Sequence, residues 1–334
     1  MVNTFFYKLF RFEFWPWYAI YLPLFPIYIF GVFYTRRLLY FTSVNPGIDM
    51  GGFYGERKDD IQELFSSNYL VKSVVIKNGD IKNLEGELIE KKINYPVIAK
   101  PIVGERGEGV RKIVDFEELL VYANSESDFI VQEYIDYSLE LGLLFYTMPK
   151  NSKTVVSSIA EKKYLSVTGN GKDSVLELLK KHRRNSLYLP LVQKEYSAKL
   201  SFIPLENEQF VVHSIGNHIK GTKFLNANNR INEKVENAIN EIVKDLKGVY
   251  FGRFDLKVPS YQDLENGKNI KIFELNGVSA EPAHIYGLSN VVLAYLSLAK
   301  HWIVVIRIAK QNIKKGVKTT PLNYFTKQLI SHFG

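Results

Sequence analysis

Two short segments near the end of the chain constrain its fold more than any other feature. They read GRFD at residues 252–255 and FELNG at residues 273–277, and a polar connection at residues 261–269 joins them. Each segment has the pattern of a short strand, and in each the charged or amide side chains stand two residues apart. Because side chains alternate along a strand, the polar groups of each segment share a face. The sequence therefore predicts two strands whose four polar groups converge on one place.

The chemistry of these four side chains indicates a site for a metal ion and phosphate. Asp255, Glu274 and Asn276 offer hard oxygen ligands, which Mg²⁺ uses when it also holds nucleotide phosphates. Arg253 adds a planar fork of donors that suits a phosphoryl oxygen. A pair of strands with solvated charges on one face is the structural alternative.

Composition limits the classes of protein to consider. A chain of 334 residues is long enough for two or three lobes with a sizeable core. It contains no cysteine, which excludes disulfides, thiolate metal sites and a cysteine nucleophile. The net charge of +8 favours phosphate ligands or an anionic membrane surface. We expect no nucleic-acid partner, because the chain has neither zinc-finger spacing nor a long basic arm.

The N-terminal part of the chain contains an uncharged, aromatic stretch of 21 residues, FWPWYAIYLPLFPIYIFGVFY, at residues 14–34. As one helix it would extend about 31 Å, close to the thickness of a bilayer's hydrocarbon core. Pro23 and Pro26 argue for a break, because a proline inside a helix costs about 3 kcal/mol. We expect residues 1–44 to form a membrane-associating helical segment, as a kinked span, a monotopic hairpin or an amphipathic insertion. A buried core helix is the alternative.

A second apolar stretch occupies residues 291–308, but Lys300, His301 and Arg307 interrupt it. These charges argue against a second span and favour an amphipathic helix. Such a helix would pack on the N-terminal segment or lie on the bilayer, and a helix docked on the core is nearly as good an interpretation. We assign residues 288–334 to this C-terminal helical segment.

The middle of the chain combines a lysine with a glycine-rich loop. An apolar strand at residues 95–101 ends near Lys100, and the loop at residues 103–110 follows with Gly107 and Gly109. A lysine at this place can reach phosphates while N–H groups of the loop close over them. A strand at residues 111–114 and a helix from Asp115, its expected N-cap, to residue 122 come next.

One more strand, at residues 129–135, ends in a polar stretch that suits a nucleoside. Its backbone groups can bind the edge of an adenine, and a carboxylate nearby can accept from both ribose hydroxyls. Glu133 lies in this strand and Glu140 follows seven residues later. For Glu133 taken alone, a surface acid is the better interpretation.

Together these motifs resemble the ATP-grasp superfamily. The resemblance rests on their order: Ala99-Lys100-Pro101, the glycine loop, Gln132 to Ile135 with Glu140, residues 252–255, and residues 274–277. D-alanine–D-alanine ligase-like enzymes are the most similar branch, and YLSVTGNGK at residues 164–172 is similar to the VTGDG segment of cyanophycin synthetase. The resemblance covers roughly residues 56–287.

The resemblance implies roles for individual positions. Lys100 and, by a looser match, Lys58 would contact phosphates, and Lys162 or Lys163 would add a third contact. Glu133, Tyr134 and Ile135 would line the adenine site, and Glu140 would bind the ribose. Asp255, Glu274 and Asn276 would hold one or two Mg²⁺ ions beside ATP. Arg253 would stabilise the transferring phosphoryl group and the tetrahedral intermediate.

Further residues are expected around the second substrate. The loop at residues 216–226 is dense in donors, and Lys220 and Lys223 would grip a carboxylate or phosphate unless they are simply solvated. N–H groups near Gly277 and Val278 would stabilise an oxyanion. Glu281 and His284 follow the metal motif and would line the acceptor pocket, with His284 as general base or as a structural residue.

Three further residues receive simpler interpretations from the sequence. His213 is expected to be structural. Arg183 and Arg184 are interpreted as surface charges, with binding of a substrate phosphate as the sharper option.

The expected fold class is α+β: an ATP-grasp fold of two α/β lobes, with an N-terminal aromatic membrane-associating segment and a C-terminal amphipathic helix. We place a linker and reduced pre-grasp element at residues 45–94. The ATP-grasp domain is expected at residues 95–287, with a small lobe at 95–136 and a large lobe at 137–287. The family usually has an α/β domain of about a hundred residues before its first phosphate lysine, whereas this chain has mostly the aromatic segment there. First-substrate recognition is therefore not carried over.

The resemblance implies an ATP-dependent ligase that activates a carboxylate as an acyl phosphate and joins it to an amine. A membrane segment in place of a substrate domain suggests small-molecule or lipid-linked substrates, contact with membrane lipids, and a catalytic domain that faces the cytoplasm. An ATP-grasp kinase, a carboxylate–hydroxyl ligase and a non-catalytic nucleotide-binding scaffold are the alternatives. Whether the chain forms a homo-oligomer stays open.

Overall fold

The computed structural model describes residues 4–53, 64–65, 69–102, 108–126, 128–151, 153–214 and 216–333. Lys58 and Gly107, two of the predicted nucleotide-binding residues, lie outside these ranges. The sequence also has a helical pattern from Asp59 to Phe65, and most of that pattern lies outside these ranges too.

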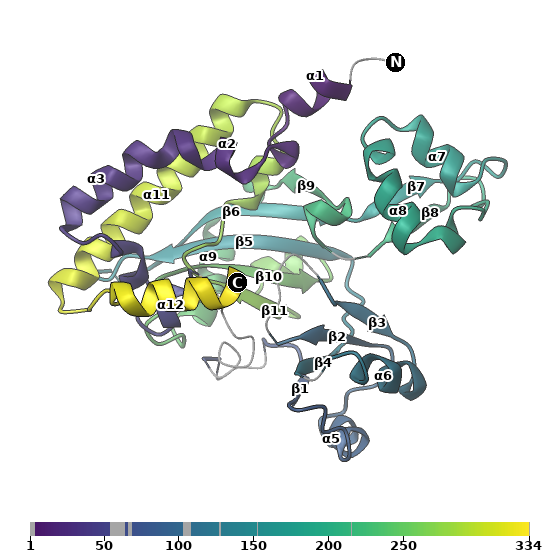
Figure 1. The fold of residues 1–334 in the computed structure, drawn as a ribbon, viewed down its shortest axis with the longest axis horizontal. Helices are drawn as coiled ribbons and strands as arrows, with labels where there is room; N and C mark the ends of the chain where they lie inside the picture. Colours follow the sequence, from purple (N-terminus) through teal and green to yellow (C-terminus); the bar gives the residue numbers. More distant parts are fainter. Residues whose placement is uncertain are drawn as a thin grey trace.

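A five-stranded antiparallel sheet forms the centre of the molecule (Figure 1). Its strand order is β11-β10-β5-β6-β9. The strands are β5 (Leu139–Thr147), β6 (Thr154–Lys163), β9 (Lys223–Asn226), β10 (Phe251–Val258) and β11 (Lys271–Asn276). Helices α9 (Glu233–Val243) and α10 (Tyr261–Glu265) belong to the core on one face of this sheet, where Ile239 and Val243 pack with buried side chains such as Leu143 and Phe254. The opposite face is left for polar groups and for the terminal helices.

A second antiparallel sheet of four strands forms a smaller lobe, with the order β1-β4-β2-β3. Its elements are β1 (Ser73–Ile76), α5 (Leu84–Glu90), β2 (Val97–Pro101), β3 (Arg111–Ile113), α6 (Phe116–Ala123) and β4 (Phe129–Glu133). The side chain of Asp115 accepts from the N–H of Glu118, so it caps α6 as the sequence predicts. Because β1 pairs with β4, this sheet begins before residue 95, the start that we expected for the small lobe.

A third unit is inserted between β6 and β9. It contains β7 (Leu165–Thr168), α7 (Val175–Lys181), α8 (Leu189–Glu195) and β8 (Gln209–His213), and β7 pairs with β8. Ser174 and Glu177 form a capping box at the start of α7. Arg184 lies in this unit, where it is buried and its guanidinium lies 2.9 Å from the Glu13 carboxylate. Both interpretations of Arg184, as a surface charge and as a ligand of a substrate phosphate, are therefore wrong. His213 is buried in the same unit, as expected of a structural histidine.

The N-terminal aromatic stretch is helical but segmented. It consists of η1 (Phe12–Phe14), α2 (Trp17–Tyr21), η2 (Leu22–Leu24) and α3 (Phe25–Thr35), after α1 (Thr4–Leu9). Pro23 and Pro26 stand in the first two positions of η2 and α3. A proline is tolerated there because its missing N–H has no partner within that segment. The prolines therefore divide the stretch, as predicted, and each lies at the start of a new helical segment.

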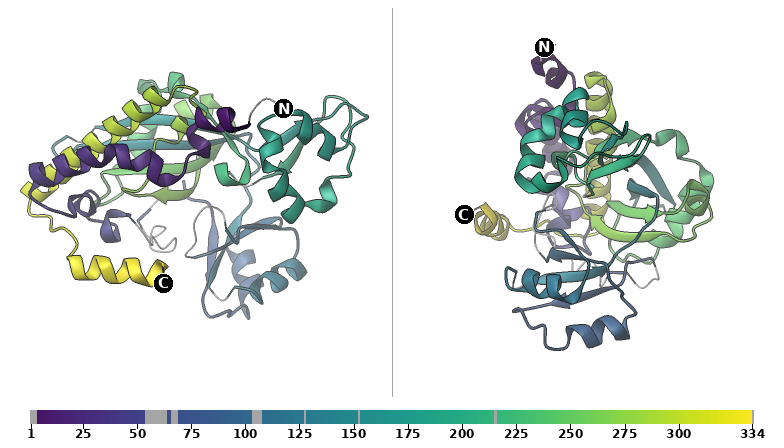
Figure 2. Two further views of the ribbon diagram at one scale, coloured as in Figure 1. Left: turned by 45° about the horizontal axis from the view of Figure 1, so that its top comes forward. Right: turned by 90° about the vertical axis from the view of Figure 1, so that its right-hand side faces the viewer.

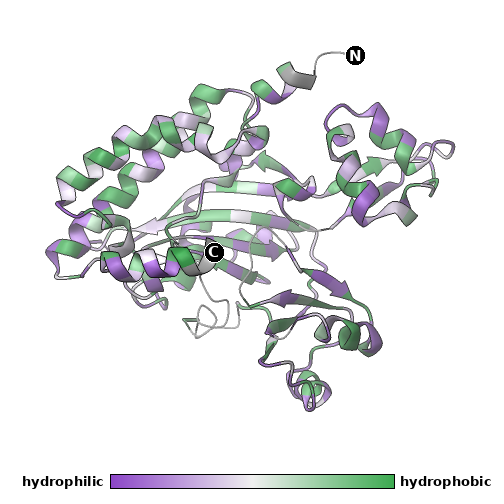
Figure 3. Cartoon of the chain, in the orientation of Figure 1, coloured by the Kyte–Doolittle hydropathy of each residue, from purple (hydrophilic) through white to green (hydrophobic). Residues whose placement is uncertain are grey.

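Two helices near the ends of the chain meet on one side of the molecule. Helix α11 (Val291–Lys314) lies beside α3, as both Figure 1 and Figure 2 show, and α12 (Leu322–Phe333) follows it. One face of α11 packs on the central sheet through Val305 and Ile308, in a cluster with Leu144 and Phe251. Hydrophobic residues predominate along α3, whereas on α11 they alternate with hydrophilic ones (Figure 3). The C-terminal helix therefore packs on the N-terminal segment, as expected, and also docks on the core, which was the alternative interpretation.

Short 3₁₀ helices complete the described chain. They are η3 (Tyr40–Ser43), η4 (Asp49–Gly51), η5 (Asn185–Tyr188), η6 (Ser197–Lys199), η7 (His218–Lys220), η8 (Asn228–Arg230) and η9 (Ala283–Gly287). The antiparallel sheets of the described residues, together with their helices, confirm the α+β class.

Candidate active site

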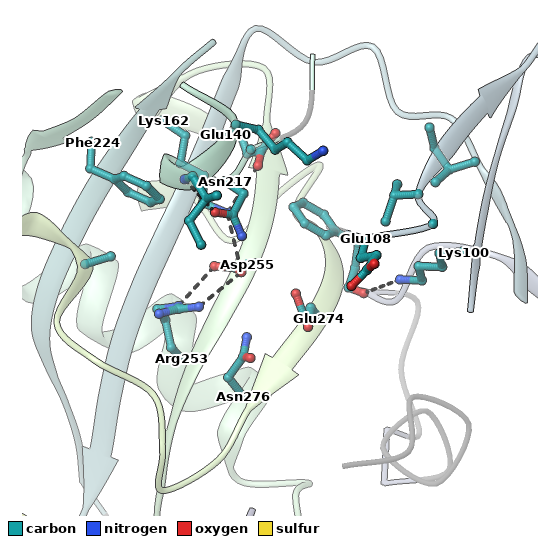
Figure 4. A pocket seen from close by; sticks show the side chains of 18 of the residues that line it. Lys100, Glu108, Glu140, Lys162, Asn217, Phe224, Arg253, Asp255, Glu274 and Asn276 are labelled. Carbon is teal, nitrogen blue, oxygen red and sulfur yellow. Dashed lines mark hydrogen bonds and ion pairs between the residues drawn. The ribbon is translucent and has the colours of Figure 1, made fainter. Parts of the chain in front are cut away.

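Strands β10 and β11 bring the four polar residues of the opening prediction onto one face. Arg253 pairs in register with Asn276, and Asp255 pairs with Glu274. Since directly opposite residues of an antiparallel pair point to the same side, all four side chains face one cavity (Figure 4). The Nε of Arg253 lies 3.2 Å from Oδ1 of Asp255. The sequence thus predicts this convergence correctly.

The neighbouring strands add an acid and a lysine to the same face. Glu140 on β5 stands opposite Lys162 on β6, and the Nζ of Lys162 lies 3.2 Å from Oε1 of Glu140. The same Nζ lies 3.4 Å from Oδ2 of Asp255, and both carboxylates and the lysine are buried. Lys163 points the other way, is half exposed and pairs with Glu161. Of the two lysines that we considered, Lys162 is the one in the cavity.

Burial and charge act against each other on these groups. Burial lowers the pKa of Arg253, but the carboxylates of Asp255 and Glu274 outweigh it and leave that pKa raised. Burial raises the pKa of Asp255, but Arg253 and then Lys162 pull it below its ordinary value. The pKa of Lys162 is raised, because Asp255 and Glu140 overcome the effect of burial. All three groups are therefore charged at neutral pH.

The small lobe contributes Lys100 and the end of the glycine loop. Lys100 is buried, lines the cavity, and its Nζ donates to the carbonyl oxygen of Phe273 on β11 at 3.1 Å. Gly109 also lines the cavity with φ +70°, and a Cβ there would stand 2.6 Å from Cγ of Pro101. Only glycine fits this conformation and this close contact.

The segment that leaves β4 lines the cavity between the two lobes. Glu133, Tyr134 and Ile135 all belong to its wall, as predicted for an adenine site. Oε1 of Glu133 accepts from the N–H of Lys72 at 2.9 Å, and the carbonyl oxygen of Ile135 accepts from Nζ of Lys257 at 2.9 Å. Glu133 is therefore held by the protein itself, which suits a positioning role.

Sequence reasoning missed several residues of this wall. Gln132 is buried and lines the cavity, and its Nε2 has no hydrogen-bond partner among the described residues; Nδ2 of Asn276 shares that property. Two unpaired buried amides on one cavity are unusual and indicate a polar ligand. The signal for Gln132 was present as an amide inside an apolar strand. Tyr164, whose hydroxyl donates to Glu140, had no comparable signal because its partner is distant in sequence.

The residues predicted for the second substrate divide into two groups. Glu281 and Lys220 line the cavity, and the carbonyl oxygen of Glu281 accepts from Arg253 at 3.4 Å. Lys220 is engaged with Glu195 at 2.5 Å. Lys223 is exposed on β9 opposite Lys163 and is not among the described residues of the cavity wall, which corrects its expected role.

The remaining predicted positions are also corrected by their surroundings. The N–H of Val278 donates to the carbonyl oxygen of Gly51 at 3.0 Å, so it is not directed at an oxyanion. Gly277 is buried beside it, and neither residue is part of the described wall. His284 is buried as well, with Nδ1 2.6 Å from Oγ of Ser158, and burial lowers its pKa to about 4. Of the two roles considered for His284, the structure favours the structural one.

A divalent cation fits the donor set only with help from other groups. The described residues contain no cluster of three or more His, Cys, Asp or Glu side chains that could hold a metal ion. Asp255, Glu274 and Asn276 offer two carboxylates and an amide on one face, and the amide has an unpaired buried atom. Mg²⁺ commonly takes one or two carboxylates and completes its shell with waters and substrate phosphates. The donor set fits Mg²⁺ that arrives with a nucleotide.

Comparisons with known proteins find a likeness in structure only. No protein-family model matches the chain, and no curated protein does. A D-Ala:D-Ser ligase (VanG) from Enterococcus faecalis is 18% identical, with a TM-score of 0.45 over 78% of this chain and 64% of that one. A D-alanine–D-alanine ligase from Bacillus anthracis is 13% identical, with a TM-score of 0.46 over 81% of this chain and 72% of that one.

A bifunctional glutathione synthetase from Pasteurella multocida is 16% identical, with a TM-score of 0.36 over 72% of this chain. The chain spans 34% of that synthetase's length, and less than two thirds of the D-Ala:D-Ser ligase. The chain is thus similar to ligases of the kind that the sequence resemblance indicates. Likeness at these TM-scores carries no argument about activity, which has to rest on the residues of the cavity.

Proposed function

We propose that the chain is an ATP-dependent ligase of the ATP-grasp type, which activates a carboxylate as an acyl phosphate and joins it to an amine. One observation carries the proposal. Arg253, Asp255, Glu274 and Asn276 share a cavity with Lys100 and Lys162, and that cavity lies between two antiparallel sheets. Two buried lysines and the partly exposed Arg253 lie among the carboxylates of Glu140, Asp255 and Glu274. Such a set suits a metal–triphosphate better than any uncharged ligand.

The chain's own residues divide the work in this proposal. Lys100 and Lys162 hold phosphate oxygens, while Glu140 and the backbone near Ile135 orient the nucleoside. Asp255, Glu274 and Asn276 would hold Mg²⁺, which would supply positive charge to the phosphates. A substrate carboxylate oxygen attacks the γ-phosphorus and ADP leaves. The amine then attacks the acyl carbon, and phosphate leaves as the new C–N bond forms.

Arg253 acts in both steps of this reaction. Its guanidinium is anchored to Asp255 and to the carbonyl oxygen of Glu281, and it lies between the metal-binding face and the acceptor side. It therefore stabilises the transferring phosphoryl group first and the tetrahedral intermediate second. Such positioning and charge stabilisation supply most of the catalysis in phosphoryl transfer.

We further propose that the enzyme works at a membrane surface, on small-molecule or lipid-linked substrates. The stretches Trp17–Thr35 and Val291–Lys314 are long and apolar enough to cross a bilayer, a criterion that core helices of soluble proteins also meet. Only 22% and 33% of their most apolar windows is buried, whereas a core helix is mostly buried. Large side chains such as Trp17, Phe30 and Phe33 are more than half exposed.

The way α11 packs favours a monotopic arrangement over a span. Its inner face is already buried on the central sheet through Val305 and Ile308, so only its outer face and α3 are available to lipid. Lys310, Lys314, Lys315 and Lys318 would add attraction to an anionic leaflet, about 1 kcal/mol for each lysine close to the surface. A domain that uses ATP would face the cytoplasm.

The proposal is tested with the purified full-length chain in detergent or vesicles. Binding of Mg·ATP is measured by calorimetry, and lipid and polar extracts are incubated with protein and ATP. Mass spectrometry should reveal a product whose mass equals two metabolites minus water, with release of ADP and phosphate. A product that gains only a phosphoryl group would identify a kinase instead, and absence of Mg·ATP binding would refute the proposal.

Matched variants link the activity to the cavity. Arg253→Ala and Asp255→Asn should each lower turnover by at least about 10²-fold, because each removes a preorganised electrostatic group. Lys163→Met, on the opposite face of β6, should leave turnover unchanged. Equal turnover in all three variants would place the chemistry elsewhere.

A further inference from the structure

The cavity that contains the candidate active site is larger than a nucleotide needs. Its volume is about 2260 Å³, whereas pockets for drug-sized ligands measure roughly 300–1,000 Å³. The extra space is bounded by apolar side chains from the two ends of the chain. We call this part of the cavity the apolar arm and define it by six of its residues: Trp15, Trp17, Ile20, Leu24, Phe25 and Trp302.

The apolar arm is connected to the reacting centre through the short helix η9. Gly142 faces Asp255, Arg253 and Ala283 of η9 at once, since a Cβ there would lie 3.4–3.8 Å from atoms of all three. Tyr286, at the other end of η9, donates to the Glu281 carboxylate and lines the cavity. The polar and apolar parts therefore meet at a single wall.

The same tyrosine belongs to the hydrophobic cluster beneath the arm. Tyr286 packs with Phe12, Ile20 and Leu24 of the N-terminal segment and with Leu298 of α11. Burial raises the pKa of the Glu281 carboxyl beside it, which marks the junction as poorly hydrated. At Tyr286, therefore, the lining of the cavity changes from charged side chains to aromatic and aliphatic ones.

The outer end of the arm opens where apolar side chains are exposed. Trp17 and Phe25 line the cavity, yet they are 69% and 56% exposed. Phe30 and Phe33 continue the apolar surface along α3 with 57% and 77% exposure. A hydrocarbon chain can follow this surface from a bilayer into the arm with little exposure to water, so its entry does not require apolar surface to be hydrated.

We propose that the apolar arm holds the hydrocarbon chain of an amphiphilic substrate, whose polar reacting end lies at Arg253 and Glu281. The occupant is the substrate's own chain, and not a structural lipid of the membrane, because the arm shares one cavity with the reacting centre. This inference rests on the proposed ligase function and narrows its substrates to lipid-linked ones. The N-terminal segment forms much of the wall of that arm.

The chain offers built-in probes for this proposal. Its three tryptophans, Trp15, Trp17 and Trp302, all line the cavity. Three single-tryptophan variants, with phenylalanine at the other two positions, report on separate parts of the arm. Dibromostearic acid serves as a quenching amphiphile below its micelle concentration, and dibromopropanoic acid serves as the short-chain control.

We expect saturable quenching of Trp15 and Trp302 by the long-chain acid and none by the short one. Phe25→Ala should weaken the long-chain interaction at least about threefold. Phe30→Ala is its matched control, because Phe30 has nearly the same exposure on the same helix but is not among the described residues of the cavity wall. Quenching confined to Trp17, or equal effects of the two alanine variants, would overturn the proposal.

Two further measurements distinguish this inference from filling of the arm by bulk lipid and from failure of the proposed ligase function. Vesicles of phosphatidylcholine and phosphatidylglycerol with brominated chains should quench Trp17 more than Trp15 and Trp302. Equal quenching of all three would mean that bulk lipid fills the arm, which contradicts the proposal. Mg·ATP binding is measured on the same samples. If Mg·ATP binds but the long-chain acid does not quench, the proposed ligase function is retained and the substrate-chain site is refuted. If the acid quenches but Mg·ATP does not bind, the apolar arm binds hydrocarbon chains and the ligase function is refuted.

Discussion

The Nζ of Lys162 lies 3.4 Å from Oδ2 of Asp255, so a residue assigned to a metal ion is paired with a buried lysine. Arg253 donates to both carboxylate oxygens of Asp255, from Nε to Oδ1 at 3.2 Å and from Nη2 to Oδ2 at 3.4 Å. These two cations balance the negative charge of the Asp255 carboxylate, which Mg²⁺ would balance in the proposed complex. In the function proposed above, nucleotide binding would exchange partners at Asp255, and Lys162 would turn from the carboxylate toward a phosphate oxygen.

Replacement of Lys162 by methionine tests this exchange. Lys162→Met should lower ATP affinity at least tenfold and destabilise the protein by about 3 kcal/mol, because it leaves buried carboxylates with fewer partners. Calorimetry with Mg·ATP and urea unfolding measure the two effects. Lys163→Met removes a neighbouring but half-exposed lysine and should change neither quantity appreciably. Unaltered ATP binding in Lys162→Met would remove this lysine from the phosphate site.

A glycine controls the position of Glu140, the predicted ribose ligand. A Cβ at Gly216 would stand 1.9 Å from Oε1 of Glu140, whereas a Cβ at Gly86 in α5 would meet nothing within 4 Å. Gly216→Ala should therefore displace Glu140 and weaken ATP binding at least tenfold. Gly86→Ala should leave binding unchanged and stabilise the protein by about 0.5–1 kcal/mol, because alanine is the better helix former. Equal ATP affinities in the two variants would contradict a role for Glu140.

His284 should make stability depend on pH in a defined window. Its pKa falls from an ordinary 6.5 to about 4, because burial disfavours the charged ring. Between these values the unfolded chain binds a proton that the folded protein does not. The free energy of unfolding should therefore decrease as pH is lowered through this window, by up to about 3 kcal/mol from this group.

The contribution of His284 is isolated by substitution. Unfolding of His284→Gln between pH 7 and pH 4 should show a shallower slope than the parent protein, while His182→Gln, at an exposed position, should retain the full slope. Turnover of His284→Gln should stay within a few-fold of the parent value. A loss of 10²-fold or more with retained stability would restore the general-base role that the structure disfavours.

The sequence allowed most of the metal-and-phosphate face to be predicted, because that face depends on local rules. Because side chains alternate along a strand, Arg253 and Asp255 must share a side. The connection between β10 and β11 is short, so the two strands are expected to be neighbours in the sheet. Alternation also separates Lys162 from Lys163, but it does not say which of them faces the cavity. That choice depends on register with β5, which pairs residues from different parts of the chain.

Predictions failed where long-range packing decides the outcome. The N–H of Val278 is taken by Gly51, more than two hundred residues earlier, and no local pattern reveals such a partner. Arg184 looked like a surface charge because it follows Arg183 in a polar stretch, yet it is buried against the N-terminal segment. The hydrophobic pattern predicted the terminal helices correctly, but it contains no information on the cavity that they share with the candidate active site.

The buried pair of Glu13 and Arg184 joins the N-terminal segment to the inserted unit of β7 and β8. Nε and Nη2 of Arg184 both donate to the Glu13 carboxylate, and its other donors reach the carbonyl oxygens of Gly221 and Thr222. Both charged side chains are at most 6% exposed. Glu13 also lines the cavity. The pair therefore fixes the N-terminal segment to the inserted unit at the cavity wall.

Removal of both partners should cost less than the sum of the two single removals. Glu13→Leu should lower the free energy of unfolding by about 3 kcal/mol, because it leaves a buried guanidinium without its counter-charge. The double variant with Arg184→Leu should be more stable than the sum of the single effects predicts, since no unpaired charge remains. Exposed Lys244 and Glu241 form a control pair whose removal should be without measurable effect. Additive losses at Glu13 and Arg184 would mean that the two charges act independently, and then the N-terminal segment is held in place by its aromatic packing alone.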